Sequence, residues 1–503
     1  MKLKIEKLQN QTSRSSLLIV LSGFISKILA AIYRIPYQNI VGDRGFYAYQ
    51  QIYPMLAIVS ALSLTAFPNV IASLSQNKDE KDLQTLFKFQ LVCSLLASLI
   101  LIVFHAPLAV MIGSPKLSPS IIVTGIVILT VPFISFYRGL AQAQSNMKPT
   151  AISQVIEQIV RIMIIIISAL AYYTFHWTIY LTANVAACGN LVASLFVLLY
   201  LIRRNDYPLK GLLTSGRVSL KNSRLIGFSS VTFIFYTLYL LLFQLIDSLF
   251  IKNSLVLSGY SDLTSEISKG IFDRGQPLIQ FGLIFTTAFY TTYLPILTKK
   301  YYDHDQGYQA DSQHFFDFIF YFNLALTIGF MGILAAMNRV LFEDNKGWLA
   351  LLIFLSLILL SSLIQFFHQK LFIEKQSKKS FIILCLGLIL KGLLTPLLTY
   401  HFGIVGSSVS SVIPLVFVLF LYAIFSDIRF LVFKNVKYFC LLIIMFVIVC
   451  FSQTFFPGQT RLESLISLLV STFIGLGVFI VISKKLLVFD QKLWSYLPFN
   501  GEK

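Results

Sequence analysis

The sequence predicts an all-α, polytopic membrane protein with about 14 transmembrane helices, arranged as two six-helix lobes in a parallel pseudo-twofold repeat plus two extra helices. Three observations carry this prediction. The 503 residues are 56% hydrophobic and only 12% charged, which excludes an ordinary soluble domain. The apolar residues gather in long segments separated by short polar ones. Several features also recur at an offset of 230 residues.

The long apolar segments define the predicted spans. A helix needs about 20 mostly apolar residues to cross about 30 Å of hydrocarbon. Segments of this length lie near residues 15–40, 47–75, 85–112, 119–143, 151–175, 178–203, 223–252, 274–300, 313–341, 347–374, 379–400, 403–427, 432–456 and 461–489. The long 223–252 segment leaves room for a surface helix, so the count could differ by one.

The recurring features indicate a duplication. An Asp-Arg-Gly triplet opens the second predicted span at residues 43–45 and the eighth at 273–275. Arg161 lies in the fifth span and Lys391 in the eleventh, at the same offset. Because six is an even number, both halves enter the membrane from the same side and form parallel repeats. Transporters built in this way hold their substrate between the two halves.

The repeat also predicts the domain organisation. We expect residues 1–203 to form an N-lobe with six spans, and residues 223–428 to form a C-lobe with six more. Residues 204–222 would be a basic cytoplasmic linker between them. Residues 429–503 have no counterpart in the repeat, and we expect two additional helices and a cytoplasmic tail there.

The distribution of basic residues predicts the topology. The net charge is +18, and the densest basic cluster lies in the predicted linker and its flanks: Arg203, Arg204, Lys210, Arg217, Lys221 and Arg224. Such positive-inside bias places both termini in the cytoplasm. We therefore interpret the basicity as topology and attraction to anionic lipids, and we predict no nucleic-acid partner. The apolar N-terminal run lacks a small-residue cleavage site and contains Lys27, so we expect a retained first span.

Charged residues inside the predicted spans are the candidate site residues. They are the basic residues Lys27, Arg34, Arg161 and Lys391 and the acids Glu157 and Asp247. A charge at this depth costs a few kcal/mol, faces a polar interior and usually marks a substrate path. The excess of positive charge predicts an anionic substrate.

The first span carries two of these cations. Lys27 and Arg34 are seven residues apart, so they lie about 10 Å apart on nearly the same helix face. They could form a ladder of cations for phosphate, or Arg34 could extend to the outer interface while Lys27 pairs with an acid. Pro36 predicts that the helix kinks or ends just after Arg34.

Two pairings are open. Glu157 and Arg161 have the i,i+4 spacing and the order that favours an ion pair, which could stabilise the helix or line a cavity. Asp247 and Lys391 are the charges inside the second half. We favour an ion pair between them, whereas the alternative is that Asp247 binds Na+ or a proton and couples an ion gradient to transport.

At the outer face, Arg44 and Arg274 begin matching helices, and we expect them to be solvated, or else to receive an anionic group as it leaves. The longest predicted external loop is about 253–273. No nucleotide-binding loop, nucleophile motif or metal-ligand spacing occurs in the sequence, so we predict no cofactor and no metal site.

The stretch SKILAAIYRIPYQNIVGDRGFYAYQQIYP, residues 26–54, resembles the start of the MurJ/SpoVB-type branch of flippases. This branch belongs to the superfamily that also contains MATE exporters, and the count of twelve plus two spans is similar to its MurJ-like members. The resemblance implies a transporter, not an enzyme, in the bacterial plasma membrane. Its cargo would be an undecaprenyl-pyrophosphate-linked sugar, moved from the inner to the outer leaflet, with cell-wall synthesis enzymes as candidate partners.

The resemblance also implies residue roles. Basic residues of the first span, here Lys27 and Arg34, would hold the pyrophosphate. The last two helices, within 432–489, would line a groove for the lipid tail, and Asp247 would be the candidate sodium ligand. Lys391 departs from the acidic character of that sodium site.

Two other functions compete with a flippase. A MATE-type cation-coupled multidrug antiporter would hold its cationic substrate with acids, but basic residues outnumber acids inside the predicted spans. A membrane glycan polymerase would need a substantial external segment with catalytic groups, and the 253–273 loop is short for an active site.

Overall fold

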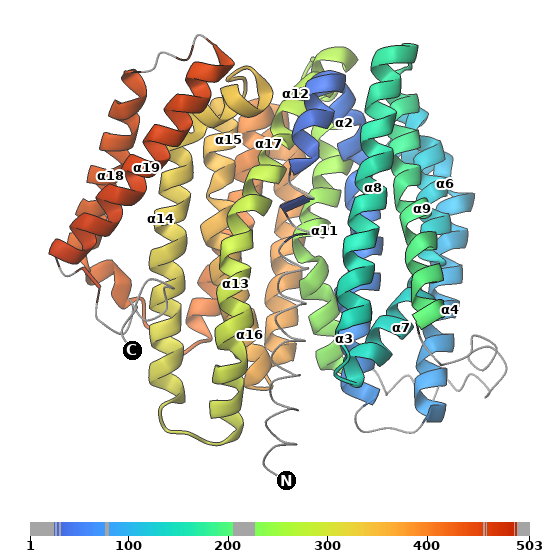
Figure 1. The fold of residues 1–503 in the computed structure, drawn as a ribbon, viewed down its shortest axis with the longest axis horizontal. Coiled ribbons are helices and arrows are strands. Elements are labelled where there is room, and N and C mark those ends of the chain that lie inside the picture. The colour runs from blue at the N-terminus through green and yellow to red at the C-terminus, as the bar shows by residue number, and fades with distance from the viewer. Residues whose placement is uncertain are drawn as a thin grey trace. The chain divides into compact units, whose positions relative to one another are not determined.

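The structure, a computed structural model, describes residues 32–75, 80–204, 227–455 and 460–486, together with residues 25, 28, 29, 458, 488 and 489. Over these ranges the chain forms long helices joined by short turns (Figure 1). Eleven of the described helical segments are long and apolar enough to cross a membrane, and a bent pair of helices adds a twelfth. The chain is therefore a multi-pass membrane protein.

Contacts divide the chain into two compact units, which we describe separately. Unit 1 comprises Met1–Asp273 and Ser377–Gly403, and unit 2 comprises Arg274–Gln376 and Ile404–Lys503. The candidate residues Asp247 and Lys391 therefore both belong to unit 1. The predicted lobe boundaries follow the sequence repeat and stay a prediction.

Unit 1 begins with a long helical path. Helix α2 (Arg34–Ala61), the π-helical turn η1 (Leu62–Ala66) and α3 (Phe67–Ser75) follow one another over 42 residues. Gly42 interrupts α2 with φ 70° and ψ 178°, a conformation that glycine adopts far more readily than other residues. A second helical segment, Asp262–Tyr302, begins nearly 230 residues after Arg34, as the sequence repeat predicts. Its length of 41 residues is similar to that of the first segment.

The sequence predicts a kink or an end of the helix near Pro36, and the structure has a turn residue at Tyr33, directly before α2 begins at Arg34. The Tyr33 N–H donates to the Leu29 carbonyl, and the Tyr37 N–H donates to the Tyr33 carbonyl, so helical bonding continues on both sides of the proline. A further interruption lies at Gly42, where the backbone conformation favours glycine.

The other elements of unit 1 are α4 (Glu80–Val103), α5 (His105–Met111), η2 (Pro115–Leu117), α6 (Ser118–Ile128), α7 (Val131–Ala143), α8 (Lys148–Phe175), α9 (Ile179–Arg204), α11 (Phe228–Leu257), α12 (Asp262–Asp273) and the first part of α17 (Ser377–Ile424). The α6 and α7 helices form the bent pair, with an angle of 42° between them. Helices α8 and α9 pack closely (Figure 1), and a Cβ at Gly189 would lie 3.2 Å from the Arg161 carbonyl oxygen.

The expectation of a long external loop at 253–273 is wrong. Residues 262–273 form the helix α12, which packs against α2. The two approach so closely that a Cβ at Gly270 would lie 2.1 Å from the Asp43 carbonyl oxygen. The polar residues Glu266, Lys269 and Asp273 are buried in this packing. The i,i+3 and i,i+4 spacing of these charges places them on one helix face. From the sequence we had interpreted the same polar residues as part of a loop.

Unit 2 contains α13 (Gly275–Tyr302), α14 (Tyr308–Phe342), α15 (Trp348–Leu355), α16 (Leu357–Ile373), the second part of α17, η4 (Leu431–Lys434), α18 (Val436–Thr454) and α19 (Arg461–Lys485). Helices α18 and α19 lie side by side and pack against α14 (Figure 1).

Dividing α17 raises the number of described spans from twelve to thirteen, close to the predicted count of about 14. A helix of 48 residues would be about 72 Å long, more than twice the hydrocarbon thickness. Gly403, with φ 58° and ψ −143°, breaks it between the predicted spans 379–400 and 403–427. Most of the first predicted span, 15–40, lies outside the described residues.

Candidate functional site

Arg34 is a buried cation with no carboxylate oxygen within 4.0 Å among the described residues. None of its side chain is exposed, and none of its three guanidinium nitrogens has a hydrogen-bond partner among the described residues. Its guanidinium carbon lies 4.2 Å from the ring centre of Tyr53 and 5.9 Å from that of Tyr33. Such cation–π contacts contribute about 0.5–2 kcal/mol each. They leave the hydrogen-bonding capacity of a planar, fork-shaped donor unused.

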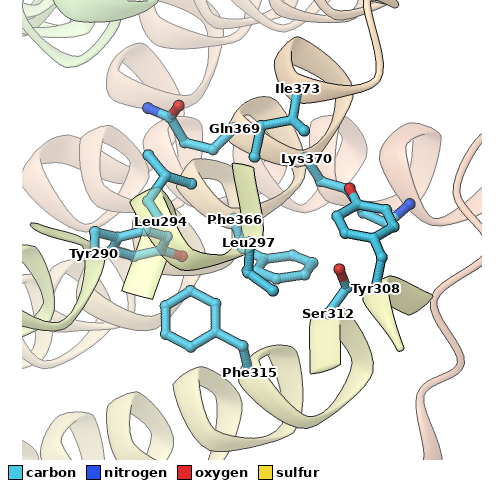
Figure 2. Close-up of a pocket in the computed structure, with 10 residues that line it drawn as sticks. All are labelled: Tyr290, Leu294, Leu297, Tyr308, Ser312, Phe315, Phe366, Gln369, Lys370 and Ile373. Carbon is cyan, nitrogen blue, oxygen red and sulfur yellow. The ribbon is translucent and has the colours of Figure 1, made fainter. Parts of the chain in front are cut away.

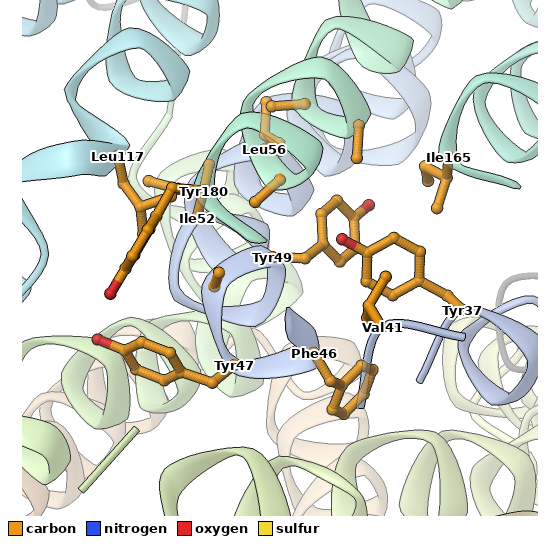
Figure 3. Packing of buried hydrophobic residues seen from close by; sticks show 14 of the residues in the cluster. Tyr37, Val41, Phe46, Tyr47, Tyr49, Ile52, Leu56, Leu117, Ile165 and Tyr180 are labelled. Atoms are coloured by element: carbon orange, nitrogen blue, oxygen red, sulfur yellow. The ribbon is translucent and has the colours of Figure 1, made fainter. Parts of the chain in front are cut away.

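Four tyrosines form one cluster beside this arginine, from two i,i+4 pairs on either side of the break at Gly42: Tyr33 with Tyr37, and Tyr49 with Tyr53. The Tyr33 and Tyr49 hydroxyls are 3.3 Å apart, and the Tyr37 and Tyr49 ring centres are 5.3 Å apart. Figure 3 shows these two rings beside each other, close to Ile165 of α8. The Tyr37 hydroxyl is buried and has no partner among the described residues. We call these four residues the tyrosine cluster.

Arg161 of α8 borders the same cluster. It is 6% exposed, and its hydrogen bonds go to neutral oxygens: Ser60 Oγ at 3.3 Å, Asn190 Oδ1 at 3.2 Å and Gln158 Oε1 at 2.6 Å. It lies within electrostatic range of Tyr33, Tyr49 and Tyr53, as Arg34 does. The two arginines therefore border one tyrosine-lined region of unit 1.

Glu157 does not form the predicted i,i+4 ion pair with Arg161. Its carboxylate lies 2.9 Å from Nη2 of Arg138, a fully buried residue of α7. Arg138 also donates to Ser153 Oγ and to the Ser63 carbonyl, so its guanidinium is held from several sides. Among the described residues, Arg161 therefore has no carboxylate in direct contact, and Glu157 acts on its charge only from beyond 4.0 Å.

Two further ion pairs lie where α11, α12 and α17 carry charges. Lys391 Nζ lies 2.5 Å from Asp247 Oδ1, the ion pair that we favoured from the sequence. Lys269 Nζ lies 2.5 Å from Asp273 Oδ1. All four side chains are almost completely buried, and the two pairs lie within electrostatic range of each other. We call these four residues the paired-charge cluster.

Arg44 and Arg274, which we predicted at the outer face, are also paired. Arg44 Nε lies 2.6 Å from Glu266 Oε2, with 44% of the Arg44 side chain exposed. Arg274, which we expected to be solvated, is only 1% exposed, because it packs on Phe342 and lies 2.5 Å from Asp344. Partial burial raises the pKa of Asp344, but hydrogen bonds from Arg274 and from the Lys346 N–H outweigh it and hold the pKa below its usual value.

Among the described residues of unit 1, Arg34 and Arg161 are thus the buried cations with no carboxylate oxygen within 4.0 Å. Lys27 lies outside the described residues. In the described part of the chain no group of three or more His, Cys, Asp or Glu side chains could hold a metal ion.

Unit 2 contains cavities of different character. The small pocket in Figure 2 is lined by α13, α14 and α16 and has a volume of about 10 Å³, enough for one water molecule. In it, Lys370, which is paired with Glu374, lies near Tyr308 and Ser312. A larger, apolar cavity of about 180 Å³ lies between α14, α18 and α19 and is lined by residues that include Phe322, Gly329, Met445 and Gly475.

Residues 13–301, more than half of the chain, match the protein family described as "Polysaccharide biosynthesis protein". The chain belongs to this family.

Several proteins are similar to this polysaccharide biosynthesis family member. The uncharacterized membrane protein YabM of Bacillus subtilis (strain 168) is 30% identical over 412 residues, 79% of this chain and 76% of YabM. The lipid II flippase MurJ of the same organism is 24% identical over 323 residues, 57% of this chain and 58% of MurJ. Its stage V sporulation protein B is 25% identical over 198 residues, 37% of this chain and 38% of that protein.

Solved structures share the fold of this family member. A lipid II flippase MurJ in an inward closed conformation has a TM-score of 0.70 at 12% identity, over 94% of this chain and 100% of that one. An inward-facing multidrug resistance MATE transporter has a TM-score of 0.58 at 13% identity, over 79% of this chain and 93% of that one. The resemblance to MurJ/SpoVB-type proteins is confirmed.

Three buried charged residues of this protein, Arg138, Lys269 and Asp273, were not among the candidates that we identified from the sequence. Arg138 lies near the end of a predicted span, where an arginine is usually solvated. Lys269 and Asp273 lie in the segment that we expected to be a loop. Their i,i+4 spacing is the one signal that could have indicated a helix there.

Proposed function

We propose that this protein flips an undecaprenyl-pyrophosphate-linked sugar from the inner to the outer leaflet of the bacterial plasma membrane. The supporting observation is the pair of buried arginines beside the tyrosine cluster, Arg34 and Arg161, which among the described residues have no carboxylate oxygen within 4.0 Å. The cargo class is that of the lipid II flippase to which the chain is similar. In this proposal both termini lie in the cytoplasm. The protein moves its cargo by alternating access and makes or breaks no covalent bond.

The chemistry of pyrophosphate suits this region. A guanidinium donates two parallel hydrogen bonds to phosphate oxygens, and such charge-assisted bonds are about twice as strong as neutral ones. The Arg34 nitrogens and the Tyr37 hydroxyl are buried donors without a partner among the described residues, so a phosphate could satisfy both. Lys27, seven residues before Arg34, would add a third cation. Because Arg34 is fully buried in this structure, the helices around it must separate before cargo can reach it.

The lipid part of the cargo would use unit 2. The apolar cavity between α14, α18 and α19 could hold part of a polyprenyl chain, and these helices include the two that the family resemblance assigns to the tail. An engineered cavity of about 150 Å³ with apolar walls binds a molecule as large as benzene.

In this proposal the ammonium group of Lys391 takes the place that a coupling Na+ ion or proton would occupy at Asp247. Its ammonium group already lies on Asp247, and both side chains are buried. We therefore expect transport to proceed when sodium is replaced by a large organic cation. If transport stops, Asp247 binds sodium in another state of the protein and the ion-coupling alternative is correct.

A MATE-type antiporter of cationic drugs is the second candidate, because its fold is shared. It would need a buried acid that is free to hold a cation. In the described residues of unit 1, the buried acids Glu157, Asp247, Glu266 and Asp273 all lie in ion pairs. This observation favours the flippase.

The proposal can be tested in vesicles that contain the purified protein and a fluorescent undecaprenyl-pyrophosphate disaccharide. A membrane-impermeant quencher reports the fraction of the lipid in the accessible leaflet. We expect rapid exchange between leaflets with the wild-type protein and none with the double variant Arg34→Gln, Arg161→Gln. The exposed Arg203→Gln, at the end of α9, is the control for loss of one positive charge. Absence of exchange together with uptake of a cationic dye would favour the antiporter.

A further inference from the structure

Asp273, the last residue of α12, uses only one of its two carboxylate oxygens. Oδ1 lies 2.5 Å from Nζ of Lys269, whereas Oδ2 is buried and has no hydrogen-bond partner among the described residues. In the described part of the chain it is the one buried carboxylate oxygen without a partner. A carboxylate accepts hydrogen bonds at both oxygens, and an unsatisfied acceptor in the interior is costly. Asp273 can therefore receive a further donor.

The contacts between α12 and α2 fix the direction in which the two helices run past each other. The helices lie side by side (Figure 1). Glu266 accepts a hydrogen bond from Arg44 Nε at 2.6 Å, and one turn further along α12 a Cβ at Gly270 would clash with the carbonyl oxygen of Asp43. Toward the end of α12, the contacts thus move toward the start of α2. The last turn of α12 is thereby brought toward the part of α2 that precedes the break.

Arg34 lies in that part of α2 and is a donor without an acceptor. All three of its guanidinium nitrogens are buried and have no hydrogen-bond partner among the described residues. Asp273 lies within electrostatic range of Arg34, although its carboxylate oxygens are more than 4.0 Å away. A guanidinium and a carboxylate that meet can form two parallel, charge-assisted hydrogen bonds. The two groups are therefore matched partners that this conformation holds apart.

The break at Gly42 lies between Arg34 and the contact that fixes α12. Gly42 has φ 70° and ψ 178°, and a Cβ there would meet no atom within 4 Å, so its surroundings are open. The next residue, Asp43, packs against Gly270. A change of the dihedral angles at Gly42 would therefore move Arg34 relative to Asp273 while the contact between Asp43 and Gly270 stays in place.

We propose that Asp273 displaces the cargo from Arg34: as the pyrophosphate leaves, Oδ2 of Asp273 takes its place on the guanidinium. This inference rests on the proposed function and adds the group that promotes release. Without a competing anion, departure of the cargo would leave the Arg34 charge uncompensated in the interior, which opposes release. The conformation described here, in which the pair is not formed, would then be ready to bind cargo.

The proposal is tested by the rate at which a fluorescent undecaprenyl-pyrophosphate disaccharide dissociates from the purified full-length protein after excess unlabelled lipid is added. Asp273→Asn keeps the size of the side chain but removes its charge. We expect it to slow dissociation about tenfold, the effect of one charge-assisted hydrogen bond lost by the competitor. The double variant Lys269→Gln, Asp273→Asn removes both charges of the pair. It leaves no unpaired charge that would prevent folding and should slow dissociation to a similar extent.

Two controls separate competition from other effects of these changes. Glu266→Gln removes a buried carboxylate from the same face of α12, but one that belongs to another ion pair, and it should leave the rate unchanged. Asp273→Asn also frees Lys269, which could itself hold the lipid. In the Arg34→Gln background, where Arg161 still binds the lipid more weakly, a freed lysine would slow dissociation, whereas our proposal predicts that Asp273→Asn has no effect there.

A wild-type rate in both Asp273 variants, equal slowing in Glu266→Gln, or slowing that persists without Arg34 would overturn the proposal. Each of these results, obtained with a wild-type protein that binds the lipid, removes the role of Asp273 and leaves the flippase function standing. Failure of the wild-type protein to bind the lipid would instead contradict the proposed function itself.

Discussion

The tyrosine cluster with its two arginines and the paired-charge cluster show two ways in which unit 1 holds buried positive charge. Lys391 and Lys269 each have a carboxylate at 2.5 Å, so their charges are compensated inside the protein. Arg34 and Arg161 contact tyrosine rings, hydroxyls and amide oxygens among the described residues, and the carboxylates of Asp273 and Glu157 act on them only from beyond 4.0 Å. A compensated charge stabilises a fold only weakly. An uncompensated one at membrane depth is expensive to keep and therefore indicates a role in binding.

Removing both uncompensated arginines should have the largest effect. For Arg34→Gln, Arg161→Gln we expect cargo affinity to fall by about 3–6 kcal/mol, because each arginine would lose a charge-assisted contact of about 1.5–3 kcal/mol. The thermal midpoint in detergent should stay the same or rise, because a buried charge without a partner is removed. Titration with an undecaprenyl-pyrophosphate sugar and a melting curve check the two parts. A large loss of stability would mean that these arginines have a structural role.

Breaking a compensated pair should affect stability instead. Lys391→Met leaves the Asp247 carboxylate buried and alone, and we expect a loss of about 3–5 kcal/mol in the free energy of unfolding. The double variant Asp247→Leu, Lys391→Met should recover most of it. Melting curves of the single and double variants measure this. If the double variant is as unstable as the single one, the loss of stability does not come from an unpaired Asp247 carboxylate.

Glu157 is one of the compensated charges. Its replacement tests whether a compensated charge affects stability without affecting cargo binding. Glu157→Gln leaves Arg138 with its hydrogen bonds to Ser153 and Ser63, so we expect a smaller loss of about 2–3 kcal/mol. Cargo affinity should change little, because the Glu157 carboxylate contacts Arg138 and acts on Arg161 only from beyond 4.0 Å. A marked gain in cargo affinity would instead show that Glu157 attenuates the Arg161 charge.

The smallest effect is expected at the Arg274–Asp344 pair of unit 2. Because the folded pKa of Asp344 is lowered, its contribution to stability is present above the unfolded value of about 3.9 and is lost as the pH falls through the folded pKa. The melting midpoint of the wild type should therefore fall more than that of Asp344→Asn when the pH is lowered through this range. Parallel curves for the two proteins would contradict the lowered pKa.

Hydropathy and charge predicted the all-α membrane fold and the burial of the charges at Arg34, Glu157, Arg161, Asp247 and Lys391, because a long apolar run or a charge within it has few alternative explanations. The partners of those charges were less predictable. The i,i+4 spacing favoured Glu157 with Arg161, but α7 brings Arg138 to Glu157 from 19 residues away in the sequence. The pair between Asp247 and Lys391, 144 residues apart, followed from there being few other charges in that half.

The helix α12 could not be predicted from hydropathy, because its buried face is charged and those charges are neutralised in ion pairs. The break at Gly42 had no strong local signal either, since nearby Pro36 was the more conspicuous helix breaker. It is this break that brings Tyr33 and Tyr37 next to Tyr49 and so forms the tyrosine cluster.

The most direct measurement compares the binding of two ligands that differ only in the pyrophosphate: an undecaprenyl-pyrophosphate sugar and the same sugar on neutral undecaprenol. For the wild-type protein we expect the charged ligand to bind at least about 100-fold more tightly, the effect of two charge-assisted contacts. In Arg34→Gln, Arg161→Gln this preference should disappear, and in Arg203→Gln it should remain. A preference that survives loss of both buried arginines would show that the anion is held elsewhere in the protein.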